Sequence, residues 1–188
     1  KGKLLDVGAY TGVFMNLAHR SGWKVWGIEP SRWAVKQAKD LNIKNDILKP
    51  NLFQKSFFDV ITIWDVIEHF SDPLKALNIV FDYLKPGGVL AMTTMDVESL
   101  TAKLMGKKWP WYMRMHRVYF SKRTMTKMLE KSGFTDIKFN PHIRYLSIRY
   151  LVSKFIKIRL PFDHLIIPIY LGDLFDVYAR KPTAVNIV

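Results

Sequence analysis

Four positions among the first 65 residues of the chain have residue types and spacing suited to binding a nucleoside. The segment Asp6-Val7-Gly8-Ala9-Tyr10-Thr11-Gly12 follows a short apolar run, and its glycines allow a ligand close to the backbone. Glu29 comes 21 residues after Gly8, and its carboxylate could accept hydrogen bonds from both hydroxyls of a ribose. Asp46 could bind an adenine amino group, and Asp65 ends a later apolar run.

Two cofactor classes compete for such a site. The dinucleotide fingerprint G-x-G-x-x-G, counted from Gly8, requires glycine at positions that hold Tyr10 and Val13. A pyrophosphate would therefore lack its glycine turn, which disfavours a nicotinamide dinucleotide.

Two histidines are candidates for proton transfer. His69 follows the apolar run that ends at Asp65, and His116 ends the aromatic and basic segment 103–116. Because imidazole titrates near neutral pH, either ring could accept a substrate proton, or it could hold a loop by hydrogen bonding. The spacing of the histidines and carboxylates matches no metal-ligand pattern, so the sequence predicts no metal site.

Alternating apolar runs and helical stretches predict a parallel sheet with crossover helices. We expect strands at 4–7, 24–28, 43–47, 59–64, 89–94, 135–139 and 173–179, helices at 13–19, 32–41, 72–84 and 122–131, and a turn at 85–88. In an open parallel sheet, ligands bind beyond the carboxyl ends of the strands. The candidate residues above lie at those ends.

Charge is distributed unevenly along the 188 residues. The first hundred residues hold 12 basic and 11 acidic side chains, a balance of +1, whereas residues 101–188 hold 17 and 5, a balance of +12. Such a field attracts anionic partners, or it keeps the protein in solution.

No cysteine is present, which excludes a disulfide scaffold. With no signal peptide and no run of the ~20 apolar residues that a membrane span needs, we expect a cytoplasmic protein.

Segments 103–116 and 143–170 interrupt the alternation and are expected to be inserts or lids. Laid on a helix, residues of the second segment share one apolar face: Ile148, Leu151, Val152, Phe155 and Ile158. This face predicts peripheral contact with an anionic inner membrane surface or with a lipid-like substrate. The alternatives are packing on the sheet or a homodimer. Nucleic acid is disfavoured because the basic residues are interleaved with aliphatic ones and form no known motif.

Four segments in order, LLDVGAYTG, GIEPS, FDVITIWDVIEHFSDP and LKPGGVL, resemble the motifs of class I S-adenosylmethionine-dependent methyltransferases. The resemblance extends from residue 3 to about 140 and is strongest to the small-molecule group of ubiquinone and menaquinone biosynthesis. It implies an α/β, Rossmann-like, doubly wound sheet of seven strands in the order 3-2-1-4-5-7-6, with strand 7 antiparallel and helices on both faces. We expect one domain over 1–188, without the helices that relatives carry upstream.

The resemblance also implies S-adenosylmethionine as cofactor and S-adenosylhomocysteine as product. The residues it assigns to cofactor binding are Asp6, Gly8, Ala9, Tyr10, Gly12, Glu29, Pro30, Asp46, Ile47, Trp64 and Asp65. Tyr10 is a departure, because the family usually has glycine there. The implied reaction is methyl transfer to O, N or C of a small, lipid-like or anionic acceptor beside His69 and His116. The alternative is a non-catalytic, methyltransferase-like module that binds through its basic surface.

Overall fold

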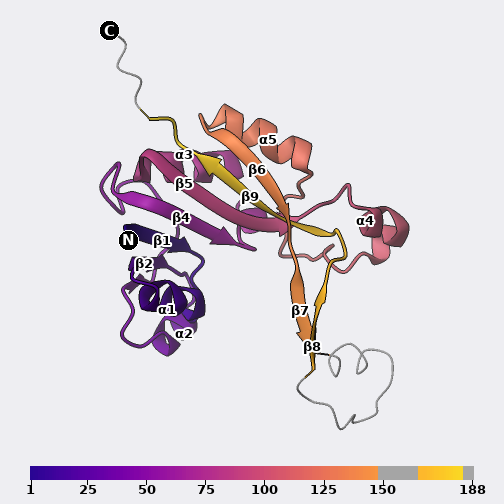
Figure 1. Ribbon diagram of the computed structural model, residues 1–188, viewed down its shortest axis with the longest axis horizontal. Coiled ribbons are helices and arrows are strands. Elements are labelled where there is room, and N and C mark those ends of the chain that lie inside the picture. Colours follow the sequence, from indigo (N-terminus) through magenta and orange to yellow (C-terminus); the bar gives the residue numbers. More distant parts are fainter. Residues whose placement is uncertain (148–164, 184–188) are drawn as a thin grey trace.

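The computed structural model describes residues 1–147 and 165–183, and its centre is a seven-stranded sheet (Figure 1). The strands, in sheet order, are β3 (Ile43–Lys44), β2 (Lys24–Ile28), β1 (Lys3–Val7), β4 (Phe58–Trp64), β5 (Leu84–Met95), β9 (Leu174–Arg180) and β6 (Thr135–Pro141). The first five run parallel, and β9 runs antiparallel between β5 and β6. This confirms the expected order, with β9 in the place of the seventh strand.

Helices cover both sides of the sheet. They are α1 (Val13–Arg20), α2 (Arg32–Gln37), α3 (Pro73–Tyr83), α4 (Leu100–Met105) and α5 (Lys122–Lys131), with short 3-10 turns η1 (Ile67–His69) and η2 (Gly106–Lys108). Figure 1 shows α1 and α2 below the sheet and α3 and α5 above it. Asp72 caps α3 by accepting from Lys75 N–H, and Pro73 opens the helix, as the sequence predicts.

The main core lies between the sheet and its helices. Strand β4 has the near-continuous apolar pattern of a strand covered on both faces, and Ile61 and Ile63 are fully buried. Leu77 and Val80 of α3 and Leu129 of α5 complete the same cluster. This core fixes the carboxyl ends of β1, β2 and β4, where the candidate residues lie.

Three local predictions are wrong. Residues 85–88 do not form a simple turn, because β5 already begins at Leu84, which pairs with Phe58 before a register shift. Gly87 adopts a φ of 78° there and donates its N–H to Lys181 O, so the segment after β9 is hydrogen-bonded to this stretch of backbone. The helix expected to reach residue 41 ends at Gln37, and the strand expected at 43–47 ends at Lys44.

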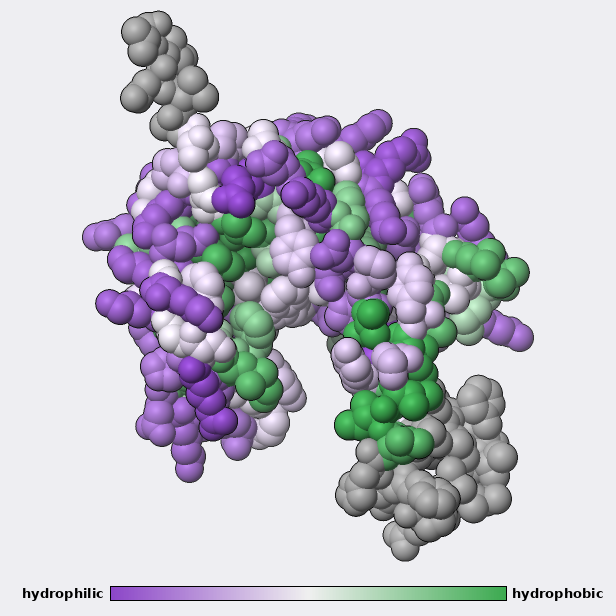
Figure 2. Space-filling model, in the orientation of Figure 1, coloured by the Kyte–Doolittle hydropathy of each residue, from purple (hydrophilic) through white to green (hydrophobic). Residues whose placement is uncertain are grey.

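A second, two-stranded sheet projects from the body. β7 (Arg144–Ser147) and β8 (Ile166–Ile169) pair antiparallel and form what we call the β7–β8 arm (Figure 1). Figure 2 shows hydrophobic residues gathered on it. Its large exposed side chains include Tyr145 and Ile166, which are 71% and 60% exposed. The predicted helical face at 148–158 lies outside the described residues. Within the described ranges, no helix has the length and apolarity to span a membrane.

Candidate active site

A cavity of about 540 Å³ lies beyond the carboxyl ends of β1, β2 and β3. That volume is within the roughly 300–1,000 Å³ of small-molecule sites. Its walls include residues from the strand ends and from the segment between β4 and α3. Five of the predicted site residues line it: Gly8, Pro30, Asp46, Ile47 and His69.

Glu29, directly after β2, does not itself line the cavity, although its neighbours Ile28 and Pro30 do, and its carboxylate links the end of β2 to the turn after β1. Its side chain is buried, and its two oxygens accept hydrogen bonds from Tyr10 N–H at 2.9 Å and from Ser31 N–H at 2.8 Å. Asn45 donates to the Glu29 carbonyl at 2.9 Å, which fixes the backbone as well. Because each carboxylate oxygen has more than one lone pair, both oxygens retain capacity for a ligand hydroxyl.

The turn after β1 requires left-handed backbone at Gly8 and Gly12, with φ values of 80° and 77°. A Cβ at Gly8 would lie 2.4 Å from a methyl of Val66, so only glycine lets the segment after β4 approach the turn this closely. Tyr10 is also left-handed at 46°, and its ring is exposed against Trp33, with 6.0 Å between centroids. Its backbone N–H donates to Glu29, and Tyr10 does not line the cavity.

Asp6 lies beneath this turn. It is 2% exposed and accepts a 2.6 Å hydrogen bond from Thr62, its partner residue on β4. Burial raises the pKa of Asp6 to about 6, although the Thr62 hydrogen bond opposes that shift. Ala9 and Gly12 are buried as well, so these three predicted residues support the turn without lining the cavity.

Asp46 and Ile47 form the cavity wall beyond β3. The Asp46 carboxylate accepts from Ile47 N–H at 2.8 Å and pairs with Lys49 at 2.6 Å, and these hydrogen bonds lower its pKa. Ile47 is 61% exposed and presents an apolar surface next to Leu48. A purine ring could lie against this wall.

Tyr83, at the end of α3, is a positioning residue that the sequence reasoning missed. Its hydroxyl donates to Lys49 O at 2.6 Å and accepts from Leu52 N–H at 2.8 Å. It thereby fixes the loop that contributes Lys49 and Pro50 to the cavity. No local pattern indicates a contact between residues so far apart in the chain.

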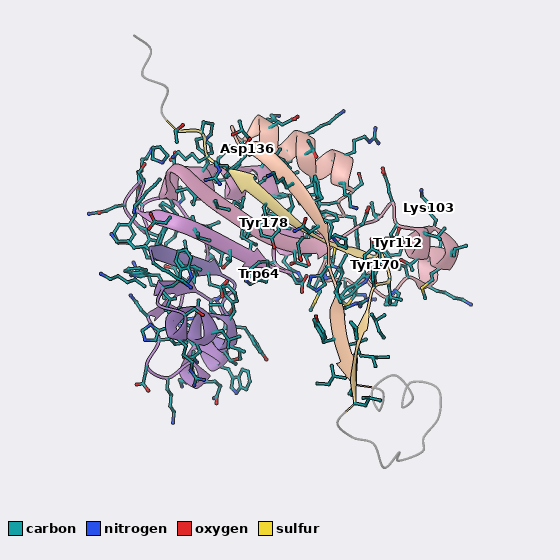
Figure 3. All side chains as sticks on the ribbon, viewed as in Figure 1. Trp64, Lys103, Tyr112, Asp136, Tyr170 and Tyr178 are labelled. Atoms are coloured by element: carbon teal, nitrogen blue, oxygen red, sulfur yellow. The ribbon has the colours of Figure 1, made fainter. Side chains whose placement is uncertain are left out.

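Trp64 is the last residue of β4 (Figure 3) and Asp65 follows it, and neither residue lines the cavity. Trp64 packs edge-on against Phe14 at 5.4 Å, and its buried indole N–H has no hydrogen-bond partner within the described part of the chain. Asp65 has a left-handed φ of 53°. Its side chain is accessible to water, yet desolvation by surrounding protein atoms and the charge of Glu68 raise its pKa to about 6.

His69 and His116 meet next to the cavity, with ring centroids 5.0 Å apart. The Nδ1 of His69 lies 3.0 Å from Met115 O, and the Nδ1 of His116 lies 2.8 Å from Trp111 O. Because a carbonyl oxygen can only accept, both Nδ1 atoms carry a proton, and a neutral ring has its lone pair on Nε2. Burial lowers the pKa of His116, which favours its neutral form.

Glu68 is the third member of this group, and the sequence reasoning gave it no role. It is 1% exposed, accepts from the Thr94 hydroxyl at 3.0 Å, and has its pKa raised by burial. One ligand-type atom from each of Glu68, His69 and His116 lies within 4.8 Å of the other two. His116 follows His69 by 47 residues in the sequence, and only the fold brings the two side chains together. Sequence spacing alone could therefore not indicate this group.

Comparison with known proteins identifies the family. Residues 1–138 match the family model described as a methyltransferase domain. Over 153 residues the chain is 32% identical to a tRNA U34 carboxymethyltransferase of Desulfotalea psychrophila, covering 73% of this chain and 47% of that protein. Over 159 residues it is 25% identical to a ubiquinone biosynthesis O-methyltransferase of Dinoroseobacter shibae, covering 74% and 64%. The chain therefore spans between about half and two thirds of these curated relatives.

The fold agrees with that assignment. The crystal structure of a SAM-dependent methyltransferase from Archaeoglobus fulgidus matches with a TM-score of 0.71 at 17% identity, covering 95% of this chain and 86% of that one. The chain belongs to the methyltransferase-domain family. Within it, the chain is a class I S-adenosylmethionine-dependent methyltransferase domain.

The residues present fit that cofactor. An adenosyl group needs hydrogen-bond acceptors for its ribose and an apolar wall for its purine. The Glu29 carboxylate at the end of β2 has lone pairs free for the first, and Ile47 in the cavity lining offers an apolar surface for the second. The glycine turn after β1 leaves the backbone open to a ligand.

Proposed function

We propose that this domain transfers a methyl group from S-adenosylmethionine to a hydroxyl oxygen of a small acceptor. The observation that carries the proposal is the position of Glu29: a buried carboxylate, fixed by two backbone N–H groups, between Ile28 and Pro30, which line a ligand-sized cavity. The ribose hydroxyls would donate to its free lone pairs. Pro30, Asp46 and Ile47 would contact the adenine, and the turn containing Gly8 would receive the methionine end.

Alignment is the main task of the protein in such a reaction. Bound S-adenosylmethionine would supply a methyl group on a positively charged sulfur. The acceptor oxygen would form the new O–C bond as the S–C bond breaks. The electron pair of the S–C bond would stay on sulfur, which would leave S-adenosylhomocysteine as the product. Trp64, the last residue of β4, and Asp65, which follows it, would fix the methionine side. Asp6 would hold the turn from below through Thr62.

The choice of oxygen as acceptor atom rests on the two histidines. A hydroxyl is a weak nucleophile and must lose its proton, whereas a neutral amine needs no base to attack. His69 lines the cavity with its Nδ1 fixed by Met115 O, so its Nε2 can accept that proton. The neutral form of His116, favoured by its lowered pKa, keeps a second lone pair beside it.

Thermal unfolding with added ligand tests the cofactor assignment. Saturating S-adenosylhomocysteine should raise the melting temperature, because a ligand that binds only the native state stabilises it, whereas NAD⁺ at the same concentration should not. Stabilisation by NAD⁺ alone would favour a dehydrogenase. A well-folded chain that responds to neither would favour a non-catalytic module.

A second candidate acceptor is nucleic acid. The relative from D. psychrophila is named a tRNA U34 carboxymethyltransferase, and residues 101–188 of this chain carry a balance of +12. Phosphate backbones bind such charge in a strongly salt-dependent way. Fluorescence anisotropy with bulk tRNA decides the question: submicromolar binding that survives 150 mM salt would favour RNA over a small molecule.

Contact with an anionic membrane is a further part of the proposal. The β7–β8 arm exposes apolar side chains, among them Tyr145 and Ile166, on the half of the chain that carries most of the positive charge. Together these features suit reversible binding to an anionic bilayer surface. A homodimer through the same arm is the alternative.

A further inference from the structure

We propose that Asp173 is a positioning residue that fixes the orientation of His116 through Trp111. Asp173 directly precedes β9, and its side chain is buried. Its carboxylate accepts from the indole N–H of Trp111 at 2.8 Å and from one terminal nitrogen of Arg144 at 2.8 and 2.9 Å. One buried side chain therefore joins the first residue of the β7–β8 arm to the segment 103–116, which ends in His116.

Trp111 connects Asp173 to His116 through its backbone carbonyl. This carbonyl accepts from the Nδ1–H of His116 at 2.8 Å, while the indole of the same residue donates to Asp173. The guanidinium of Arg144 also lies over the Trp111 ring, 5.6 Å from its centre, and restrains it further. Because the indole and the carbonyl belong to one residue, we expect a shift of the indole to move the acceptor that orients the imidazole.

The orientation of the His116 ring determines where its lone pair lies. The residue is 8% exposed, and the centroid of its ring lies 5.0 Å from that of His69. With Nδ1–H directed at the Trp111 carbonyl, the lone pair of the neutral ring is on Nε2. Without that carbonyl, either nitrogen could carry the proton. The consequence for proton acceptance rests on the proposed function, whereas the contacts themselves do not.

A carboxylate is the group that these contacts require. The indole of Trp111 and the guanidinium of Arg144 are both donors, and the two oxygens of Asp173 accept from both at once. Arg144 also supplies the positive charge that a buried carboxylate needs. An asparagine side chain has nearly the same size but only one oxygen, and its NH₂ group would face a donor. Asp173→Asn therefore breaks these contacts with little change in volume.

Asp173 also lies where the arm meets the main sheet. Both strands of the arm lead to it, because Arg144 opens β7 and β8 ends at Ile169, four residues before Asp173. The Asp173 carbonyl accepts from the N–H of Asp96, directly after β5, at 2.9 Å. The arm and His116 are thus held to the sheet by the same residue.

NMR of the imidazole nitrogens tests the proposal, because it distinguishes the two neutral tautomers of a histidine. Well above the ordinary histidine pKa of about 6.5, we expect the parent to show His116 as the Nδ1–H tautomer alone. Trp111→Phe keeps an aromatic ring and leaves Asp173 paired with Arg144, so it should fold normally. It and Asp173→Asn should each give averaged tautomer signals. In Asp173→Asn the Trp111 indole N–H should also exchange with solvent about tenfold faster. The matched control is Asp136→Asn, which removes an exposed carboxylate on β6 and should leave the His116 signals unchanged.

The proposal is overturned if the parent shows no fixed His116 tautomer, or if His116 keeps it in folded Trp111→Phe or Asp173→Asn. A lower melting temperature with unchanged His116 signals would mean that Asp173 acts on stability alone.

Titration of the same proteins with S-adenosylhomocysteine separates this proposal from the proposed function. Neither Asp173 nor Trp111 lines the cofactor cavity, so both variants should bind as the parent does. A parent that binds no S-adenosylhomocysteine, although Trp111→Phe alters the His116 signals, would remove the proposed function and leave the positioning contact standing. Unaltered His116 signals in variants that bind S-adenosylhomocysteine would do the reverse.

Discussion

The carboxylate of Glu29 accepts a hydrogen bond from the backbone N–H of Tyr10 at 2.9 Å, and this contact joins the end of β2 to the turn after β1. The resemblance to class I methyltransferases implies glycine at the position that Tyr10 holds in that turn. The structure accommodates the tyrosine because its backbone is left-handed and its ring lies against Trp33, outside the cavity lining. What the site needs from this position is an N–H group.

Replacing Tyr10 by glycine should therefore leave cofactor binding intact. Tyr10→Gly is expected to keep the affinity for S-adenosylhomocysteine within about twofold, because the N–H to Glu29 remains. Relief of the left-handed strain, roughly 1–2 kcal/mol, should offset part of the lost packing on Trp33. Calorimetric titration measures the affinity. A tenfold loss would mean that the tyrosine ring contacts the cofactor.

Removing the hydroxyl of Tyr83 should loosen the loop that carries Lys49 and Pro50. Tyr83→Phe leaves Lys49 O and Leu52 N–H without their partner, at a cost of about 1–3 kcal/mol in the free energy of unfolding. Urea denaturation measures this loss, and the affinity for S-adenosylhomocysteine should fall with it. Tyr112→Phe is the control, since that ring is exposed and the described structure gives its hydroxyl no hydrogen bond. Equal stability of the two variants would contradict the role of Tyr83.

Ionisation of Asp6 should make stability depend on pH. Its pKa is about 6 in the folded chain and 3.8 in an unfolded one, so between these pH values the folded state binds more protons. The contribution of Asp6 to the free energy of unfolding is then largest below pH 4, and it falls by about 3 kcal/mol as the pH rises through 6. Asp6→Asn should lack this component in urea denaturation at pH 4 to 7.5. Parallel curves for parent and variant would show that Asp6 titrates normally.

The β7–β8 arm should associate with anionic vesicles. The chain is expected to sediment with phosphatidylglycerol liposomes at low salt and to be released at high salt, because surface charge attraction is screened. Replacing Tyr145 and Ile166 by serine should abolish sedimentation. Leu104→Ser, an exposed apolar position on α4, should not change it. Equal recovery on neutral vesicles would exclude the anionic membrane as partner.

The sequence predicts the sheet well because its information is local. The apolar run of β4 and the Asp72-Pro73 start of α3 each specify their own element, and the ordered motifs specify the strand order. The predictions of local structure are wrong where contacts with distant segments of the chain determine the conformation. Leu84 joins a strand because Phe58 is there to pair with it, and Gly87 is held by Lys181.

The candidate site follows the same division. Glu29 and Gly8 were predictable because each ends a recognisable strand, and the parallel sheet brings such ends together. The Tyr83 hydroxyl and the Glu68–His116 contact join segments 34 and 48 residues apart in the chain. Only the folded backbone determines which of many polar side chains meet across such separations.

The central claim is that Glu29 binds the ribose of S-adenosylmethionine, and calorimetric titration of S-adenosylhomocysteine into the parent and Glu29→Gln tests it most directly. Glu29→Gln keeps the size of the side chain, and Glu130→Gln on the exposed surface of α5 is the matched control. We expect one site of micromolar affinity in the parent and control, and at least a tenfold loss in Glu29→Gln, since hydrogen bonds to a charged group contribute about 1.5–3 kcal/mol. No heat from the folded parent, or unchanged affinity in a folded Glu29→Gln, would contradict the account.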